Sequence, residues 1–443
     1  MEVVQSLRSH IRENTKLAVP VMLSNLGHML MAVSDNVMVG HIDATALASA
    51  GLATVAFNVL LLYGIGVSYA ITTIVAEAAG EKNELRITQT LRHGLVINVI
   101  NALFLLAVIY FGKGVLFHIG QDEAVVEGAI PYLEIITFSL VPVLIFQSFK
   151  QFAEGLGNTR IALVVVMVAN VLNIFLNYGM IFGHFGFEAR GLVGAGWATF
   201  ISRVFMTVAI ALYVYYHGPF KKFRAGFSMT GFSKSLFSKM LNIGIPSGLQ
   251  FIFEVAAFDL SLVMMGWLGT KTQAAHQIVI NLASLSYMIT AGLAAAATIR
   301  IGYFFGSQEK ENMRRASWSL LGMGLILMSV FALIFVLARH HLPWLYVEDA
   351  EVVPIASSLL IVAGLFQLSD GLQVICNGAL RGLQDVRVPS VFIFVSYWVV
   401  GLPLGYWLTF VMGVGPNGIW YGLLIGLTLT GFAMYLRLRR LLA

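Results

Sequence analysis

Charged side chains are scarce in this sequence. Aspartate, glutamate, lysine and arginine make up 11% of its 443 residues, and hydrophobic residues make up 58%. Soluble domains average about 25% charged residues. No polar stretch between the apolar runs is long enough to form a soluble domain. The composition therefore predicts an integral membrane protein.

Cysteine and the common catalytic motifs are also nearly absent. The single cysteine, Cys376, lies in an apolar run, which excludes a disulfide framework. The sequence has no GxxxxGKS/T motif for nucleotides, no HExxH or GxSxG motif and no cluster of cysteine and histidine. The formal charge of +5 comes from residues in short loops, so it does not indicate nucleic-acid binding. We expect no enzyme activity, no cofactor and no nucleic-acid partner.

Apolar runs, by contrast, are long and numerous. A transmembrane helix needs about 20 mostly apolar residues. The first such run follows a basic N-terminal segment and is too long for a cleaved signal peptide, so we interpret it as a retained span. The sequence predicts an all-α membrane protein with twelve transmembrane helices, at residues 17–39, 46–78, 92–112, 127–153, 161–183, 192–216, 241–266, 273–304, 316–338, 353–379, 388–412 and 416–436.

The distribution of basic residues predicts the orientation. Twenty lysines and arginines fall in one set of connections, whereas the opposite set holds Lys113, Arg190, Lys271 and Arg339. Basic loops stay in the cytoplasm. We therefore expect both termini to be cytoplasmic.

The chain repeats itself at an offset of 226 residues. Pro20 corresponds to Pro246, and the motif at 37–40 corresponds to the one at 263–266. The repeat predicts an N-terminal lobe at 1–216, a basic cytoplasmic linker at 217–240 and a C-terminal lobe at 241–443. Each lobe has six spans, an even number, so the lobes share one orientation and are parallel repeats, a common plan in transporters.

Carboxylates interrupt the apolar runs of the C-terminal half. Glu254 lies near the middle of its span, and Asp370 shares a helix face with Phe366, Gln373 and Asn377. A charge buried in hydrocarbon is unfavourable by about 3 kcal/mol or more, which favours a functional role. Two carboxylates with amide oxygens suit a hard cation such as Na⁺, and the same carboxylates could instead bind and release a proton. The residues alone leave both uses open.

The N-terminal half has its own acid and amides. Asp35 lies near the extracellular end of the first span, and Asn173 and Asn177 share one face of the fifth. A further polar stripe contains Gln277 and Asn281 in the eighth span. Such amides can line a cavity, or they can hold neighbouring helices together. We expect Asp35 to join Glu254 and Asp370 in cation coupling.

Several of these features resemble the multidrug and toxic compound extrusion (MATE) family. They are the opening span ending SDNVMVGHI, the loops EGLGNTR and RGLQDVR, the two six-span halves, and the buried Glu254 and Asp370. The pair of acids resembles the NorM-type branch, whose C-terminal-lobe acids are implicated in cation binding. Asp35 matches that family's first-span acid. In the related DinF-type branch a second acid lies in the fifth span, where this chain has Asn173 and Asn177. This difference argues against a coupling site in the N-terminal lobe alone and favours Glu254 and Asp370 as the coupling residues.

The resemblance implies a V-shaped pair of lobes and a function. We expect a monomeric antiporter in the bacterial inner membrane that exports aromatic cationic drugs and dyes in exchange for Na⁺ or H⁺. Glu254 and Asp370 would hold the Na⁺. The alternative is a lipid-linked oligosaccharide flippase of the same fold. Such a flippase would be expected to line its cavity with several cationic residues, whereas in this sequence only Arg203 lies well inside a span. We expect membrane lipid around the spans and a cavity lined by Phe366, Gln277, Asn281, Tyr287, Gln373, Asn173 and Asn177.

Overall fold

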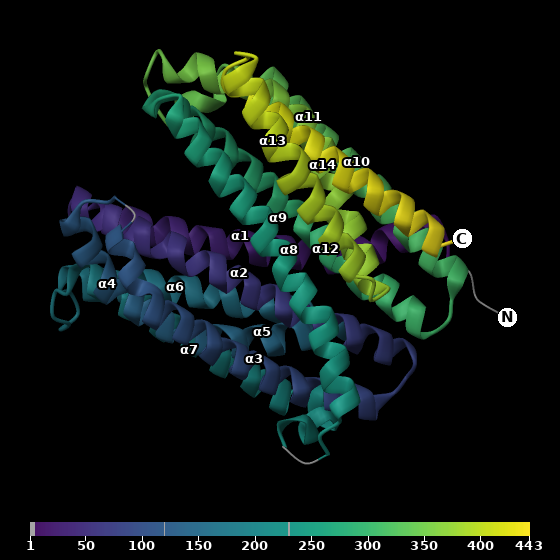
Figure 1. Cartoon of the computed structure of the whole chain (residues 1–443). Helices are drawn as coiled ribbons and strands as arrows, with labels where there is room; N and C mark the ends of the chain where they lie inside the picture. The colour runs from purple at the N-terminus through teal and green to yellow at the C-terminus, as the bar shows by residue number, and fades with distance from the viewer. Residues whose placement is uncertain (1–4, 119, 229–230) are drawn as a thin grey trace. The chain divides into compact units, whose positions relative to one another are not determined.

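The computed structural model describes residues 5–118, 120–228 and 231–443, and in those residues helices joined by short loops make up the fold, without strands (Figure 1). Within these described ranges, twelve helices are long and apolar enough to cross a membrane, which confirms the predicted number. The elements are α1 (Leu7–Gly40), α2 (Ala44–Gly80), α3 (Glu84–Gly112), η1 (Lys113–His118), α4 (Glu123–Phe138), α5 (Leu140–Gly155), α6 (Arg160–Phe182), α7 (Gly191–Tyr216), η2 (Gly218–Phe227), α8 (Lys234–Trp267), α9 (Thr270–Gly306), α10 (Lys310–Leu337), η3 (Leu342–Leu345), α11 (Val352–Gly382), α12 (Arg387–Phe394), η4 (Val395–Gly401), α13 (Leu402–Tyr406), η5 (Trp407–Val411) and α14 (Pro416–Leu441).

Some spans contain more than one element. Helices α4 and α5 form one span that is interrupted at Ser139, three residues before Pro142. Proline has no N–H to donate to the carbonyl one turn earlier, so it weakens a helix at this point. The span at Arg387–Val411 contains two π-helical segments, η4 and η5. Such segments are rare and often occur at functional sites.

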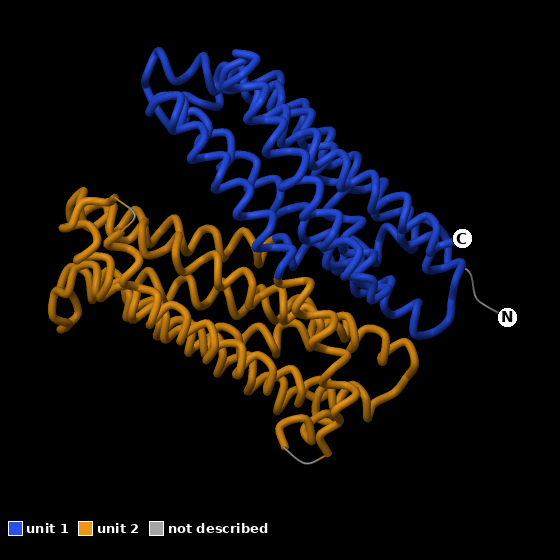
Figure 2. The backbone as a smooth tube through the Cα atoms, in the orientation of Figure 1, with its two compact units in different colours: residues 1–22, 249–443 blue, residues 23–248 orange. Residues whose placement is uncertain are grey.

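The chain divides into two compact units (Figure 2). The N-terminal unit comprises residues 23–248, and the C-terminal unit comprises residues 1–22 and 249–443. The first turns of α1 therefore belong with the C-terminal helices, and the first turns of α8 belong with the N-terminal ones. The predicted linker at 217–240 contains η2 and the beginning of α8, while its residues 229 and 230, like residues 1–4 of the predicted N-terminal lobe, lie outside the described ranges.

The sequence repeat is also a repeat of structure. Helices α2 and α9 are each 37 residues long, and they begin at Ala44 and Thr270, 226 positions apart. Thr72 donates its hydroxyl to the Gln151 carbonyl oxygen at 3.1 Å, and Thr298 donates to the Gly378 carbonyl oxygen at 2.9 Å. These two bonds join matching helices, α2 to α5 and α9 to α11. Each unit therefore builds the same helix contact from matching residues.

Each unit has its own apolar core. Phe57, Leu105 and Leu133 lie in the core of the N-terminal unit, and Tyr397 and Trp420 lie in that of the C-terminal unit. Many large hydrophobic side chains remain exposed on the other helix faces. This pattern is expected when lipid replaces water as the surrounding solvent, because exposed apolar side chains are then favourable.

Candidate functional site

The two predicted carboxylates of the C-terminal unit lie close together. Glu254 projects from α8, and Asp370 projects from α11 and is 4% exposed. The two acids interact electrostatically. Gln373, one turn after Asp370, donates its side-chain amide to Glu254 Oε1 at 2.9 Å. The face predicted from the spacing along α11 is therefore directed towards α8, and it brings both acids into one polar site.

Tyr397 completes this site and was not predicted from the sequence. Its side chain is fully buried, and its hydroxyl donates to Gln373 Oε1 at 3.4 Å. It also interacts electrostatically with both Glu254 and Asp370. Tyr397 belongs to the π-helical segment η4, whose wider turn departs from the usual helical spacing. A signal that could have identified it is a tyrosine in an otherwise apolar run.

A second layer of amides lies next to the acids in the C-terminal unit. Gln250 donates its amide to the Val386 carbonyl and to Ser390 Oγ, both at 3.0 Å, and accepts a hydrogen bond from Asn377 at 3.0 Å. These bonds join α8 to α11 and to the beginning of α12. Because the bonds of Gln250 are made within the protein, this layer holds the helices that carry the acids.

The remaining predicted residues of the C-terminal unit lie in different surroundings. Phe366 is buried and packs edge-on against Phe258 and Trp420, with ring centroids 6.0 and 5.7 Å apart. Tyr287 is half-buried and interacts electrostatically with Tyr397. The two polar residues of α9 lie on a more exposed face, where Gln277 donates to Asn281 at 3.2 Å. Phe366 and Tyr287 thus connect to the group around the acids, while Gln277 and Asn281 bond each other.

The N-terminal unit surrounds its acid with neutral donors. Asn177 of α6 donates to Asp35 Oδ1 at 2.5 Å, and Thr199 of α7 donates to Asp35 Oδ2 at 3.3 Å. Asn177 also donates to Asn173 Oδ1 at 3.2 Å. Both asparagines are fully buried. The predicted stripe therefore reaches Asp35, whereas the contribution from Thr199 was not predicted.

A positive charge acts on Asp35 without forming a direct ion pair with it. Arg203 of α7 interacts electrostatically with Asp35 and Tyr132, and it donates to Ser139 Oγ at 2.5 Å. Its guanidinium also lies over the Phe57 ring, 4.8 Å from the centroid. A cation over an aromatic ring is favourable, and more so away from water. The N-terminal acid therefore has a neighbouring cation of its own.

The two sites differ in net charge. Within the described residues, no lysine or arginine acts electrostatically on Glu254 or Asp370, whereas Arg203 acts on Asp35. No group of three or more histidine, cysteine, aspartate or glutamate side chains comes together in the described part of the chain. A cation at the C-terminal site would therefore have two carboxylates and the neutral oxygens of Gln373 and Tyr397. Hard cations prefer oxygen ligands of these kinds.

Comparison with known proteins supports the repeat and the fold. The MatE family model matches residues 20–179 and 246–407, and the two segments begin at Pro20 and Pro246, the residues that open the repeat. The chain is 32% identical over 440 residues to the "Probable multidrug resistance protein NorM" of Rhizobium meliloti (strain 1021), covering 98% of this chain and 94% of that protein.

Two further comparisons cover nearly the whole chain. The "Multidrug resistance protein MdtK" of Yersinia pseudotuberculosis serotype O:1b (strain IP 31758) is 33% identical over 430 residues, which is 96% of this chain and 94% of that protein. The crystal structure of the eukaryotic MATE transporter AtDTX14 has a TM-score of 0.88 at 22% identity, covering 97% of this chain and 95% of that one. This second likeness shows that the fold is shared.

Proposed function

Because this chain belongs to the MatE family, that of the multidrug and toxic compound extrusion transporters, we propose that it is a multidrug efflux transporter. It exports aromatic organic cations in exchange for Na⁺ or H⁺. The observation that carries this proposal is the pair Glu254 and Asp370, two acids inside membrane-spanning helices without a basic neighbour among the described residues. Two nearby negative charges repel each other, and a bound cation relieves that repulsion.

In this proposal Glu254 and Asp370 hold the coupling ion. Gln373 orients Glu254 through its amide, and Tyr397 orients Gln373 through its hydroxyl. Either Na⁺ or H⁺ neutralises negative charge at the pair, so both remain candidates. The coupling ion drives transport only if it binds one conformation of the transporter more tightly than another. The acids lie on α8 and α11, so ion binding changes the balance of forces between these two helices.

Asp35 has a secondary role in the same proposal. Its carboxylate is satisfied by Asn177 and Thr199, and Arg203 supplies a compensating charge. Because Arg203 offsets its charge, Asp35 attracts a further cation less strongly than Glu254 and Asp370 do. Asp35 therefore responds to a proton or to a bound drug cation, while the coupling ion occupies the C-terminal site. Within the C-terminal unit, Phe366 and Tyr287, with the polar residues of α9, contribute to the cavity for the drug.

The proposal includes the setting of the protein. In this proposal the chain is a monomer in the bacterial inner membrane. The positive-inside rule supports placing both termini in the cytoplasm. Its relatives in Rhizobium meliloti and Yersinia pseudotuberculosis are bacterial proteins, which supports this location.

A transport assay tests the function. The full chain is reconstituted in liposomes, and ethidium movement is followed by fluorescence under an imposed Na⁺ gradient or an imposed pH gradient. We expect movement under at least one gradient and its loss when monensin or nigericin collapses that gradient. Absence of dye movement under both gradients, with correctly inserted protein, would reject cation-coupled drug export. Movement of a lipid-linked oligosaccharide in the same vesicles would then favour the flippase.

A further inference from the structure

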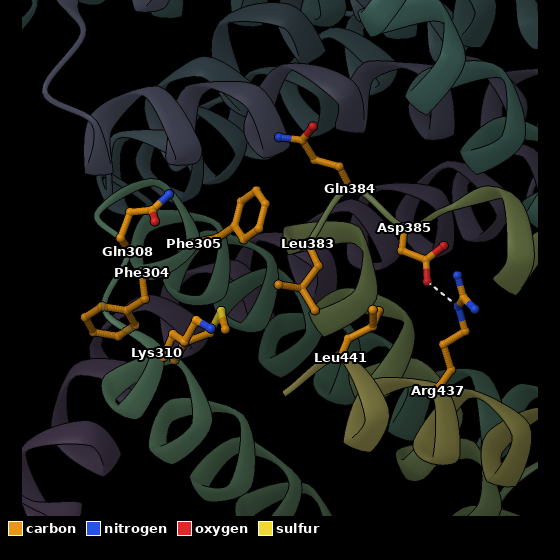
Figure 3. Close-up of a pocket in the computed structure, with 10 residues that line it drawn as sticks. Phe304, Phe305, Gln308, Lys310, Leu383, Gln384, Asp385, Arg437 and Leu441 are labelled. Atoms are coloured by element: carbon orange, nitrogen blue, oxygen red, sulfur yellow. Dashed lines mark hydrogen bonds and ion pairs between the residues drawn. The ribbon is translucent and has the colours of Figure 1, made fainter. Parts of the chain in front are cut away.

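A cavity of 420 Å³ lies at one end of the C-terminal unit, away from the carboxylate pair. It lies where α9 ends, α10 begins and α14 ends, next to the loop after α11 (Figure 3). Its lining includes Phe304, Lys310, Leu383, Asp385, Arg437 and Leu441. The lining therefore combines apolar side chains with two cations and one acid.

The acid in this lining is already paired. Asp385 Oδ2 accepts a hydrogen bond of 2.5 Å from Arg437 Nε, the interaction drawn as a dashed line in Figure 3. This bond uses one nitrogen of the guanidinium, and among the described residues its two terminal nitrogens have no hydrogen-bond partner. Lys310 forms no ion pair within the described residues and is exposed. With Lys310 and Arg437 against Asp385, the lining has an unbalanced positive charge.

The sequence repeat shows what occupies the matching corner of the N-terminal unit. The repeat partner of Lys310 is Glu84, which forms an ion pair with Lys222 of η2. Phe220 and Phe223 of η2 are buried there and pack against Phe152. The N-terminal corner is thus covered by the chain itself, and its acid is matched by a lysine of the covering segment.

At this repeat position the C-terminal corner has the opposite charge, and in the described residues it has an open cavity. A lysine stands where the other unit has a glutamate, so the partner that completes this corner must be anionic. Arginine offers paired donors that match phosphate oxygens, and lysine adds a point charge. Phe304, Leu383 and Leu441 provide an apolar wall beside these cations. An anionic head with an apolar body satisfies both parts of the lining.

We propose that this cavity binds the phosphate headgroup of an anionic phospholipid, held by Lys310 and Arg437. The predicted orientation places the cavity at the cytoplasmic face, where anionic lipids gather and basic pockets between spans bind their headgroups. Arg439 and Arg440, both exposed on the last turn of α14, add to the positive field at this end. The lipid would cover this corner of the C-terminal unit and pair with its charged residue, as η2 does in the N-terminal unit.

Lipid binding to the full chain in a neutral detergent tests the proposal. Dioctanoyl-phosphatidylglycerol, dioctanoyl-phosphatidylcholine and inorganic phosphate are titrated separately. Bound lipid is counted by native mass spectrometry, and the dissociation constant is taken from the shift in unfolding temperature. We expect one saturable phosphatidylglycerol that binds more tightly than phosphatidylcholine. Lys310→Gln should weaken it about fivefold, the effect of losing one basic residue near an anionic lipid.

Two control variants sharpen the result. Lys310→Arg keeps the charge and should retain binding, and Arg314→Gln removes a neighbouring exposed charge that already pairs with Glu311. Equal affinity for both lipids, or unchanged affinity in Lys310→Gln, would overturn the proposal. Displacement of phosphatidylglycerol by equimolar inorganic phosphate would show that the site binds a soluble phosphate and not a lipid headgroup, which would overturn the proposal. None of these readouts requires transport, so they stand apart from the test of drug export.

Discussion

Gln373 links the acid Glu254 to the tyrosine Tyr397. Its amide nitrogen lies 2.9 Å from Glu254 Oε1, and its carbonyl oxygen lies 3.4 Å from the Tyr397 hydroxyl. One side chain of α11 thus fixes an acid of α8 and contacts the π-helical segment η4. The ion-binding geometry that we propose depends on this link.

Replacing Gln373 by leucine should impair coupling without unfolding the protein. The change removes a hydrogen bond to a charged group, which is worth about 1.5–3 kcal/mol, so the concentration of coupling ion that gives half-maximal efflux should rise about tenfold or more. Ethidium efflux measured against Na⁺ or H⁺ concentration checks this. Gln250→Leu is the control, because Gln250 bonds Val386, Ser390 and Asn377 rather than an acid. An equal shift in both variants would contradict a specific role for Gln373.

Two substitutions of Tyr397 should separate its hydroxyl from its ring. Tyr397→Phe removes a long hydrogen bond and should reduce stability by less than about 1 kcal/mol. Tyr397→Ala empties a fully buried position and should reduce stability by about 3–5 kcal/mol, as truncation of other buried aromatic side chains does. Unfolding temperatures in detergent measure both effects. Similar losses in the two variants would show that the ring contributes little to packing.

Close helix packing makes Gly378 intolerant of a side chain. A Cβ at this position would lie 2.3 Å from the Ala294 carbonyl oxygen of α9, a backbone atom that cannot move aside. Gly378→Ala should therefore destabilise the protein by about 1–3 kcal/mol. Gly322→Ala is the control, because a Cβ there meets no atom within 4 Å, and it should stabilise α10 by about 0.5–1 kcal/mol. Thermal unfolding of both variants in one detergent gives the comparison.

Arg203 and Asp35 should behave as a coupled pair. Arg203→Gln leaves Asp35 without its neighbouring cation, and Asp35→Asn leaves Arg203 without its anion. Each single change should lower the unfolding temperature, and the double variant should lose less than the sum of the two. The expected coupling is about 0.5–3 kcal/mol, the range for residues in one polar network. Strict additivity would show that the two charges do not interact.

The sequence predicted the features that follow regular helical spacing. The twelve spans are confirmed because long apolar runs have few other folded solutions. The spacing of Asp370, Gln373 and Phe366 gave one helix face, and the structure directs Gln373 of that face to Glu254. The sequence could not predict Tyr397, because η4 departs from that spacing. The role of Arg203 also required the structure, since a lone arginine in a span does not identify its partners.

Efflux from proteoliposomes after neutralisation of the C-terminal acids tests the central claim most directly. Glu254→Gln and Asp370→Asn are compared with Asp259→Asn, which removes an exposed acid from the same helix as Glu254. We predict that both site variants reach the membrane in normal amounts but move ethidium no faster than empty liposomes under either a Na⁺ or a pH gradient. The Asp259 variant should match the native chain. Full gradient-driven efflux in the Glu254 and Asp370 variants, with loss in Asp35→Asn, would contradict the account and assign coupling to the N-terminal unit.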